Sequence, residues 1–181
     1  MVYILLGEGF EETEAVVPCD LLRRGGVQTC FVSLDAPAVR GAHGIEITAE
    51  LTVDAVEPET MELLVLPGGM GGVRSMERSE KAMALLDYAA QHGIRIGAIC
   101  AAPTILGKRG LLRGRRAVCY PGLEGELSGA EYVAEPVVCD GNIICSMGPG
   151  TAFPFGIALL RALRGEPAAE EVRTKFLPDH G

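Results

Sequence analysis

The 181-residue chain contains no tryptophan, and aromatic residues make up only 5% of it, so aliphatic side chains must fill its interior. Basic residues are outnumbered by acidic ones, 16 against 24, which gives a formal net charge of −8. This balance argues against general binding to nucleic acids or to anionic membranes. No stretch approaches ~18 consecutive apolar residues, and no basic start precedes an apolar run. We therefore expect a soluble cytoplasmic protein that does not associate with membranes.

Histidine is scarce, and closely paired cysteines are missing. The three histidines, at positions 43, 92 and 180, are not spaced as paired metal ligands, and no CxxC pair occurs among the six cysteines. We therefore expect no metal site, zinc in particular, and thiols that stay reduced as in cytosol. Free cysteines in apolar runs behave as small buried hydrophobic residues, which is the expectation for Cys30, Cys119, Cys139 and Cys145.

One local excess of positive charge stands out against the acidic background. It lies in a glycine-rich connection and consists of Lys108, Arg109, Arg113, Arg115 and Arg116. A solvated loop is the simpler interpretation of this basic cluster, and an anion-binding patch is the alternative.

Short apolar runs alternate with segments of helical periodicity. This alternation predicts one domain, residues 1–181, with an α/β fold in which a mainly parallel sheet carries helices on both faces. Asp140-Gly141 marks a hairpin. The expected strands are residues 2–6, 27–34, 44–53, 63–66, 94–99, 117–120, 133–139 and 142–146. The expected helices are residues 13–24, 79–92, 101–108, 151–163 and 168–175.

Cys100 stands in "GAICAAP", between an apolar strand and a helix. Sites in such sheets form beyond the carboxyl ends of the strands, which here are residues 7–14, 67–72 and 97–103. At a sharp strand-to-helix turn, the free N–H groups and the dipole of the helix stabilise a thiolate and lower the thiol pKa. The pattern is that of a nucleophile elbow with cysteine as the nucleophile. The alternative is a buried structural cysteine, as expected for the others.

Glu14 differs from the acidic residues beside it in "GFEETEAVVPCDLL". It begins the apolar stripe of the helix, so its carboxyl group should face the interior, have a raised pKa and stay protonated. A protonated glutamate beside a thiol can donate a hydrogen bond to the thiolate. Glu11 and Glu12 are expected to be solvated and to complement the helix dipole.

The third strand end carries the glycine pair of "LPGGMGG". Gly68 and Gly69 would let backbone N–H groups point at a developing oxyanion. The alternative is an ordinary Pro-Gly-Gly turn. Together, the three strand ends would supply a nucleophile, a modulating acid and an oxyanion cradle.

Four motifs occur in an order and spacing that resembles the ThiJ/PfpI superfamily, specifically the branch of the parkinsonism-associated deglycase. They are "EGFEETEAVVPCDLLRRGG", "VLPGG", "AICAAPTIL" and "GPGTAFPFGIALLRAL", and the resemblance covers essentially the whole chain. It implies a flavodoxin-like three-layer sandwich, related to class I glutamine amidotransferases, and a homodimer. It also implies Cys100 and Glu14 as catalytic residues, with the backbones of Gly69 and Ala101 as oxyanion donors and no cofactor.

The chain departs from the family pattern near the expected pocket, which the resemblance builds from Tyr120, Pro149 and Gly150. Tyr120 stands where many members have histidine, which puts hydrolytic and fast glyoxalase chemistry in doubt, and Met147 stands where arginine is frequent. Ala101 replaces the histidine that follows the nucleophile in the protease-like branch, so peptidase activity is not expected.

The resemblance implies two kinds of function. The first is cofactor-independent glyoxalase or deglycase chemistry, in which Cys100 adds to an α-oxoaldehyde such as methylglyoxal or acts on an early glycation adduct. The second is a redox sensor or stress chaperone without enzymatic activity, which works through oxidation of Cys100 to the sulfinic acid. A reactive thiolate would serve both.

Overall fold

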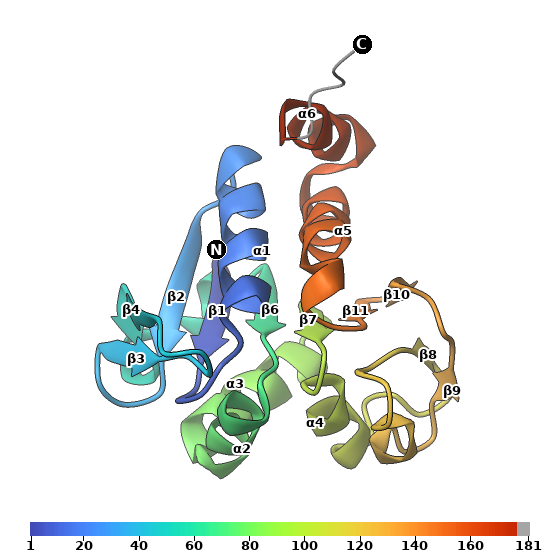
Figure 1. Cartoon of the computed structure of the whole chain (residues 1–181), viewed down its shortest axis with the longest axis horizontal. Coiled ribbons are helices and arrows are strands. Elements are labelled where there is room, and N and C mark those ends of the chain that lie inside the picture. The colour runs from blue at the N-terminus through green and yellow to red at the C-terminus, as the bar shows by residue number, and fades with distance from the viewer. Residues whose placement is uncertain (177–181) are drawn as a thin grey trace.

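A computed structural model of the chain describes residues 1–176, with a seven-stranded sheet at its centre (Figure 1). All neighbouring strands are parallel except β10, which pairs antiparallel with β11. The order across the sheet is β10 (Val137–Asp140), β11 (Ile143–Ser146), β7 (Arg95–Ile99), β6 (Leu63–Leu66), β1 (Val2–Leu6), β2 (Thr29–Ser33) and β5 (Leu51–Thr52). The predicted mainly parallel α/β sheet and the hairpin at Asp140-Gly141 are confirmed.

Helices cover both faces of the sheet. The chain runs from β1 through α1 (Glu12–Arg24) to β2, and from β6 through α2 (Met70–Arg78) and α3 (Glu80–Gln91) to β7 in the opposite direction. Connections between parallel strands are right-handed, so α1 lies on one face of the sheet, and α2 and α3 lie on the other face. Helix α5 (Ala152–Arg164) packs beside α1, and α6 (Glu166–Phe176) packs on α5. No helix among residues 1–176 is long and apolar enough to span a membrane.

The central strands form the core. Every side chain of β1 and β6 is buried, because each of these strands has a neighbour on both sides and helices above and below. These two strands are continuous apolar runs, as expected for strands buried on both faces. Ser79 caps α3, since its hydroxyl accepts the N–H of Ala82 at 3.2 Å.

Short elements lie outside the main sheet. The remaining strands pair as β3 (Ala38–Arg40) with β4 (Glu46–Thr48), and β8 (Arg116–Ala117) with β9 (Glu131–Tyr132). The expected strand at 44–53 is therefore two strands, β4 and β5, which belong to different sheets. Of the strand expected at 117–120, only Ala117 lies in a strand, as the last residue of β8. Single 3-10 turns lie at Val53–Ala55, Pro58–Thr60, Glu124–Glu126 and Pro149–Thr151, and the short helix α4 spans Pro103–Lys108.

Helix α2 was not expected, because Gly71 and Gly72 disfavour a helix in its first turn. The structure gives a reason for both glycines. A Cβ at Gly71 would lie 3.0 Å from the Cα of Gly9, and one at Gly72 would lie 2.8 Å from the Cα of Phe10. The helix can therefore approach the segment after β1 only with glycine at these positions.

The cysteines are less uniform than expected. Cys119 and Cys145 are buried, but Cys30 is only partly buried and Cys139 is exposed on the edge strand β10. The expectation was wrong for Cys139 because side chains alternate along a strand, and Cys139 points away from the face on which its neighbour Val138 is buried.

The basic cluster is largely neutralised by acidic side chains. Lys108 pairs with Glu77, and Arg109 pairs with Asp87. Arg116 pairs with Glu135 at 3.1 Å. These ion pairs favour the solvated loop over an anion-binding patch.

Replacement of Gly107 by alanine should destabilise the fold. A Cβ at this buried position of α4 would lie 2.2 Å from the Glu126 carbonyl oxygen, and backbone atoms cannot rotate away. Overpacking of this kind costs about 1–3 kcal/mol, which exceeds the gain of up to ~1 kcal/mol from the helix preference of alanine. Urea denaturation should show a lower free energy of unfolding. The matched control is Gly125→Ala, where the added Cβ meets nothing within 4 Å; equal stability of the two variants would contradict the prediction.

Candidate active site

The three predicted strand ends meet at one edge of the sheet. Glu14 lies in the first turn of α1 after β1, Gly68 follows β6, and Cys100 follows β7, and these three strands are neighbours. A Cβ built on Gly68 would lie 2.6 Å from Glu14 Oε2 and 2.7 Å from Cys100 Cβ. The carboxyl group and the cysteine therefore both lie against Gly68, at the place where a side chain would begin, and any larger residue there would collide with both.

Cys100 has a strained backbone. Its φ is 64°, and among residues 1–176 it is the sole non-glycine residue with a positive φ. Its N–H donates to the Ser146 carbonyl at 2.9 Å, and its own carbonyl accepts the N–H of Tyr120 at 2.8 Å. Strain of this kind costs about 1–3 kcal/mol and persists where neighbouring contacts hold it. The thiol is thus fixed at a sharp turn, with 9% of the residue exposed.

The helix dipole is a weaker stabiliser of the sulfur than expected. Helix α4 begins only at Pro103 and has six residues, so Cys100 does not occupy its first turn. Nearer groups take this role, because the backbone N–H groups of Gly69 and Ala101 interact with the sulfur and lower the pKa of the Cys100 thiol. These are the two donors that the family resemblance implies.

Gly68, the other expected donor, is already engaged. Its N–H donates to Glu14 Oε2 at 2.8 Å, so it orients the carboxyl group instead of pointing at the sulfur. The sequence pattern could not distinguish the two glycines, because both follow the same strand.

Glu14 is fully buried, as its place on the apolar stripe predicted. Burial raises the pKa of this carboxyl to about 7, although its interactions with Cys100 and with the Gly68 N–H act in the opposite direction. Its second oxygen, Oε1, is buried and has no hydrogen-bond partner among the described residues. An ionised carboxylate would leave that oxygen charged and unpaired, so the environment favours the protonated form.

Cys100 and Glu14 titrate as a pair. Burial, and then the negative charge of an ionised Glu14, raise the pKa of the Cys100 thiol to about 12. The expected low thiol pKa therefore does not hold while Glu14 is ionised. Once the pair has lost its first proton near pH 7, the two groups hold one proton between them. Placing that proton on Glu14 leaves a thiolate that can accept hydrogen bonds from the carboxyl group and from two backbone N–H groups.

Tyr120, Pro149 and Gly150, the expected pocket residues, lie together. With Pro121, Met147, Gly148 and Thr151 they line a hollow of about 250 Å³. Tyr120 is 49% exposed and is hydrogen-bonded through its backbone to Cys100. The hollow is therefore next to the elbow.

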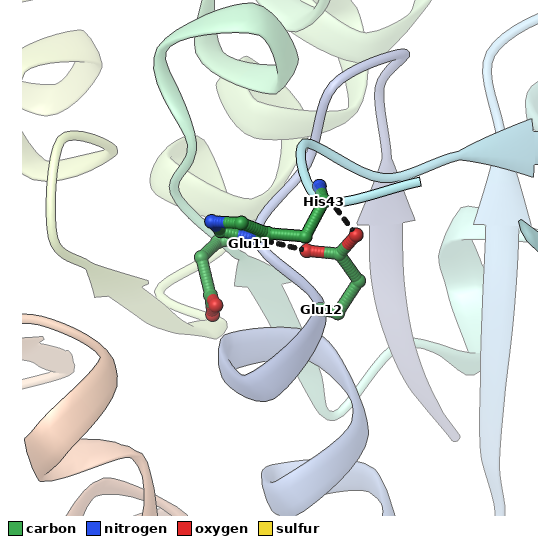
Figure 2. A group of neighbouring side chains, drawn as sticks. All are labelled: Glu11, Glu12 and His43. Carbon is green, nitrogen blue, oxygen red and sulfur yellow. Dashed lines mark hydrogen bonds and ion pairs between the residues drawn. The ribbon is translucent and has the colours of Figure 1, made fainter. Parts of the chain in front are cut away.

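Glu11 and Glu12 are buried, which corrects the expectation that they are solvated. Glu11 caps α1 by accepting the N–H of Glu14 at 2.8 Å. Glu12 accepts the N–H of His43 at 2.7 Å, and its other oxygen lies 2.9 Å from His43 Nδ1 (Figure 2). The two side chains thus organise the start of α1 and the loop at His43, a long-range pairing that local sequence patterns cannot indicate.

Within residues 1–176, Glu11, Glu12 and His43 form the one group of potential metal ligands whose donor atoms lie within 4.8 Å of one another. Glu12 already accepts two bonds from His43, and Glu11 accepts the bond that caps α1. A cation would have to replace these bonds, so the geometry describes a structural contact.

Comparison with known proteins shows a single family. The model of the DJ-1/PfpI family matches residues 1–162. Protein dj-1beta of Drosophila melanogaster is 36% identical over 177 residues, covering 96% of this chain and 95% of that protein. A protein named a deglycase, from Pyrococcus horikoshii, is 32% identical over 165 residues, covering 90% of this chain and 99% of that protein.

Solved structures agree with this fold. The crystal structure of Drosophila melanogaster DJ-1beta superposes with a TM-score of 0.93 at 34% identity, covering 99% of this chain and 98% of that one. A structure described as oxidized DJ-1 of Toxoplasma gondii has a TM-score of 0.93 at 32% identity and covers 97% of each chain.

Removal of the Glu14 carboxyl group should move formation of the Cys100 thiolate to higher pH, because the pair can then no longer lose one proton near pH 7 and keep the other on Glu14. Glu14→Leu removes the protonated carboxyl group that can donate a hydrogen bond to the thiolate. Glu14→Gln keeps an N–H donor, so a larger fraction of Cys100 should be thiolate in this variant than in Glu14→Leu. The measurement is thiolate ultraviolet absorbance against pH for wild type and both variants. A thiolate that forms at lower pH in Glu14→Leu than in wild type would show that an ionised Glu14 opposes it.

Proposed function

Because the chain belongs to the DJ-1/PfpI family, we propose that it is a cofactor-independent cysteine enzyme for reactive α-oxoaldehydes or their early glycation adducts. The observation that carries this proposal is that Cys100 and the fully buried Glu14 carboxyl lie together against Gly68 and interact with each other. Some relatives at about 30% identity are named deglycases, which supports the same chemistry.

The first step is addition of the Cys100 thiolate to the aldehyde carbon. A carbon–sulfur bond forms, the carbonyl π bond breaks, and the oxygen takes the proton from Glu14, which gives a hemithioacetal and leaves Glu14 as the carboxylate. The N–H groups of Gly69 and Ala101 would stabilise the negative charge on this oxygen as it develops. A protonated Glu14 keeps the sulfur in its nucleophilic form without placing a second negative charge beside it.

The second step moves a proton between the two carbons of the substrate. Glu14, as the carboxylate, takes the proton from the former aldehyde carbon to give an enediolate, and the hydroxyl proton of that carbon passes to the oxygen of the neighbouring carbon. Glu14 then returns its proton to the neighbouring carbon, which leaves a thioester. The first carbon is oxidised and the second is reduced, so no external oxidant or cofactor is needed. Water then cleaves the resulting thioester and releases a 2-hydroxy acid and the thiol.

A Glu14 pKa of about 7 suits this relay, because the group can give and take a proton near neutral pH. With tyrosine at position 120, no histidine shares the proton transfer, so Glu14 carries it alone and turnover is slow. Attack on an early glycation adduct would use the same thiolate.

Oxidation of Cys100 is the second candidate function. Its supporting observation is that a protonated Glu14 and the N–H groups of Gly69 and Ala101 could hold a sulfinate at the same position. One relative's structure is described as oxidized DJ-1. In this case the chain acts as a redox sensor or stress chaperone, and aldehyde turnover is absent.

Replacement of Cys100 by alanine should abolish conversion of methylglyoxal to lactate, with a loss of about 10³-fold or more, because covalent addition is no longer possible. Glu14→Gln should lower kcat by about 10²–10⁴-fold, since it cannot relay a proton. Steady-state formation of lactate is the readout. The matched control is Cys139→Ala, which removes an exposed thiol distant from the elbow and should leave the rate unchanged. Equal rates for wild type and Cys100→Ala would favour the sensor function.

The protein should form a homodimer, as the family resemblance implies. Large apolar side chains are exposed at Val16 on α1, at Ile45 and at Met70 on α2, and a second copy that covered them would remove apolar surface from water. Light scattering should give twice the chain mass of 19.1 kDa at micromolar concentration. A mass of one chain under these conditions would contradict the prediction.

A further inference from the structure

The hollow beside Cys100 is built on the backbone of the elbow itself. One wall begins at Tyr120, whose N–H donates to the Cys100 carbonyl at 2.8 Å. A second wall begins at Met147, directly after Ser146, whose carbonyl accepts the Cys100 N–H at 2.9 Å. Hydrogen bonds therefore tie the starts of both walls to the backbone of Cys100.

The chemistry of the hollow is apolar. None of its seven lining residues is charged: they are Tyr120, Pro121, Met147, Gly148, Pro149, Gly150 and Thr151. The ring of Tyr120 lies against the backbone of Gly148, where a Cβ would be only 3.2 Å from its Cδ2. This contact holds a half-exposed aromatic ring in place, with one side available to a ligand.

The hollow is larger than the substituent of the smallest substrates requires. Its volume is about 250 Å³, whereas a group the size of a methyl needs roughly the ~30 Å³ that one water occupies in the liquid. Aromatic rings pack favourably on other rings and on methionine sulfur, and both surfaces are present here at Tyr120 and Met147.

We propose that this hollow holds the substituent on the ketone carbon of the substrate, so that the chain prefers aryl-substituted α-oxoaldehydes to methylglyoxal. This inference rests on the proposed function. The aldehyde carbon would bond to the Cys100 sulfur, while the aryl ring lies in the hollow, against the exposed side of the Tyr120 ring and beside Met147 and Pro149. The absence of charged lining residues also disfavours substrates with a charged substituent.

The test compares phenylglyoxal with methylglyoxal as substrates, by initial rates of mandelate and lactate formation. Wild type should have a kcat/KM at least about tenfold higher for phenylglyoxal, the discrimination that an apolar pocket supplies. Gly150→Leu places a side chain in the hollow without strain, since a Cβ there meets nothing within 4 Å. It should lower the phenylglyoxal-to-methylglyoxal ratio by about tenfold. Gly125→Leu, an equally open glycine outside the hollow, should leave the ratio unchanged.

Two outcomes separate this inference from the proposed function. If wild type converts both aldehydes with equal kcat/KM and Gly150→Leu does not change the ratio, the inference is overturned and the proposed function stands. If wild type converts neither aldehyde, the proposed function fails, and binding of mandelate against lactate, measured by calorimetry, decides the inference. Tighter binding of mandelate that Gly150→Leu removes supports the hollow as an aryl subsite, and equal binding overturns it.

Discussion

The buried carboxyl group of Glu14 is the constraint on which the site depends. It lies in the interior with one oxygen bonded to the Gly68 N–H at 2.8 Å and the other without a described partner. A charge in that place is costly, so the carboxyl group holds a proton at a pH where an exposed glutamate would have lost it. The Cys100 thiolate gains from this proton, because an ionised Glu14 would oppose its negative charge. The burial of Glu14 therefore influences the reactivity of Cys100.

The fold makes this coupling possible by bringing together residues that are distant in sequence. Glu14, Gly68 and Cys100 follow three neighbouring parallel strands, whose carboxyl ends lie at the same edge of the sheet. Between β1 and β6 the chain reverses the direction in which it adds strands, and α/β proteins form their sites at such points. Glycine at position 68 is required because the two reactive side chains occupy the space where its Cβ would stand.

The same hydrogen bonds hold the strained backbone of Cys100 and the apolar hollow. The hydrogen bonds from Tyr120 and to Ser146 hold the positive φ of Cys100 and also set the positions of the two walls of the hollow. Tyrosine at position 120, where the family resemblance implies that many members have histidine, therefore changes the surroundings of the thiol in a second way. It replaces a ring that titrates near neutral pH with a larger and less polar ring.

The sequence by itself determined the α/β alternation, the parallel sheet, the elbow at Cys100 and the interior position of Glu14. All of these follow from local periodicity, which the burial of each element preserves. Only the tertiary structure decided that Gly68 binds Glu14, that Glu11 and Glu12 are buried, and that α2 exists despite Gly71 and Gly72. It also placed Cys139 on an exposed edge and raised the pKa of the Cys100 thiol through burial and, after burial, through the charge of an ionised Glu14. These features depend on contacts between segments far apart in the chain, and the pattern of residues along one segment does not indicate which distant segment it contacts.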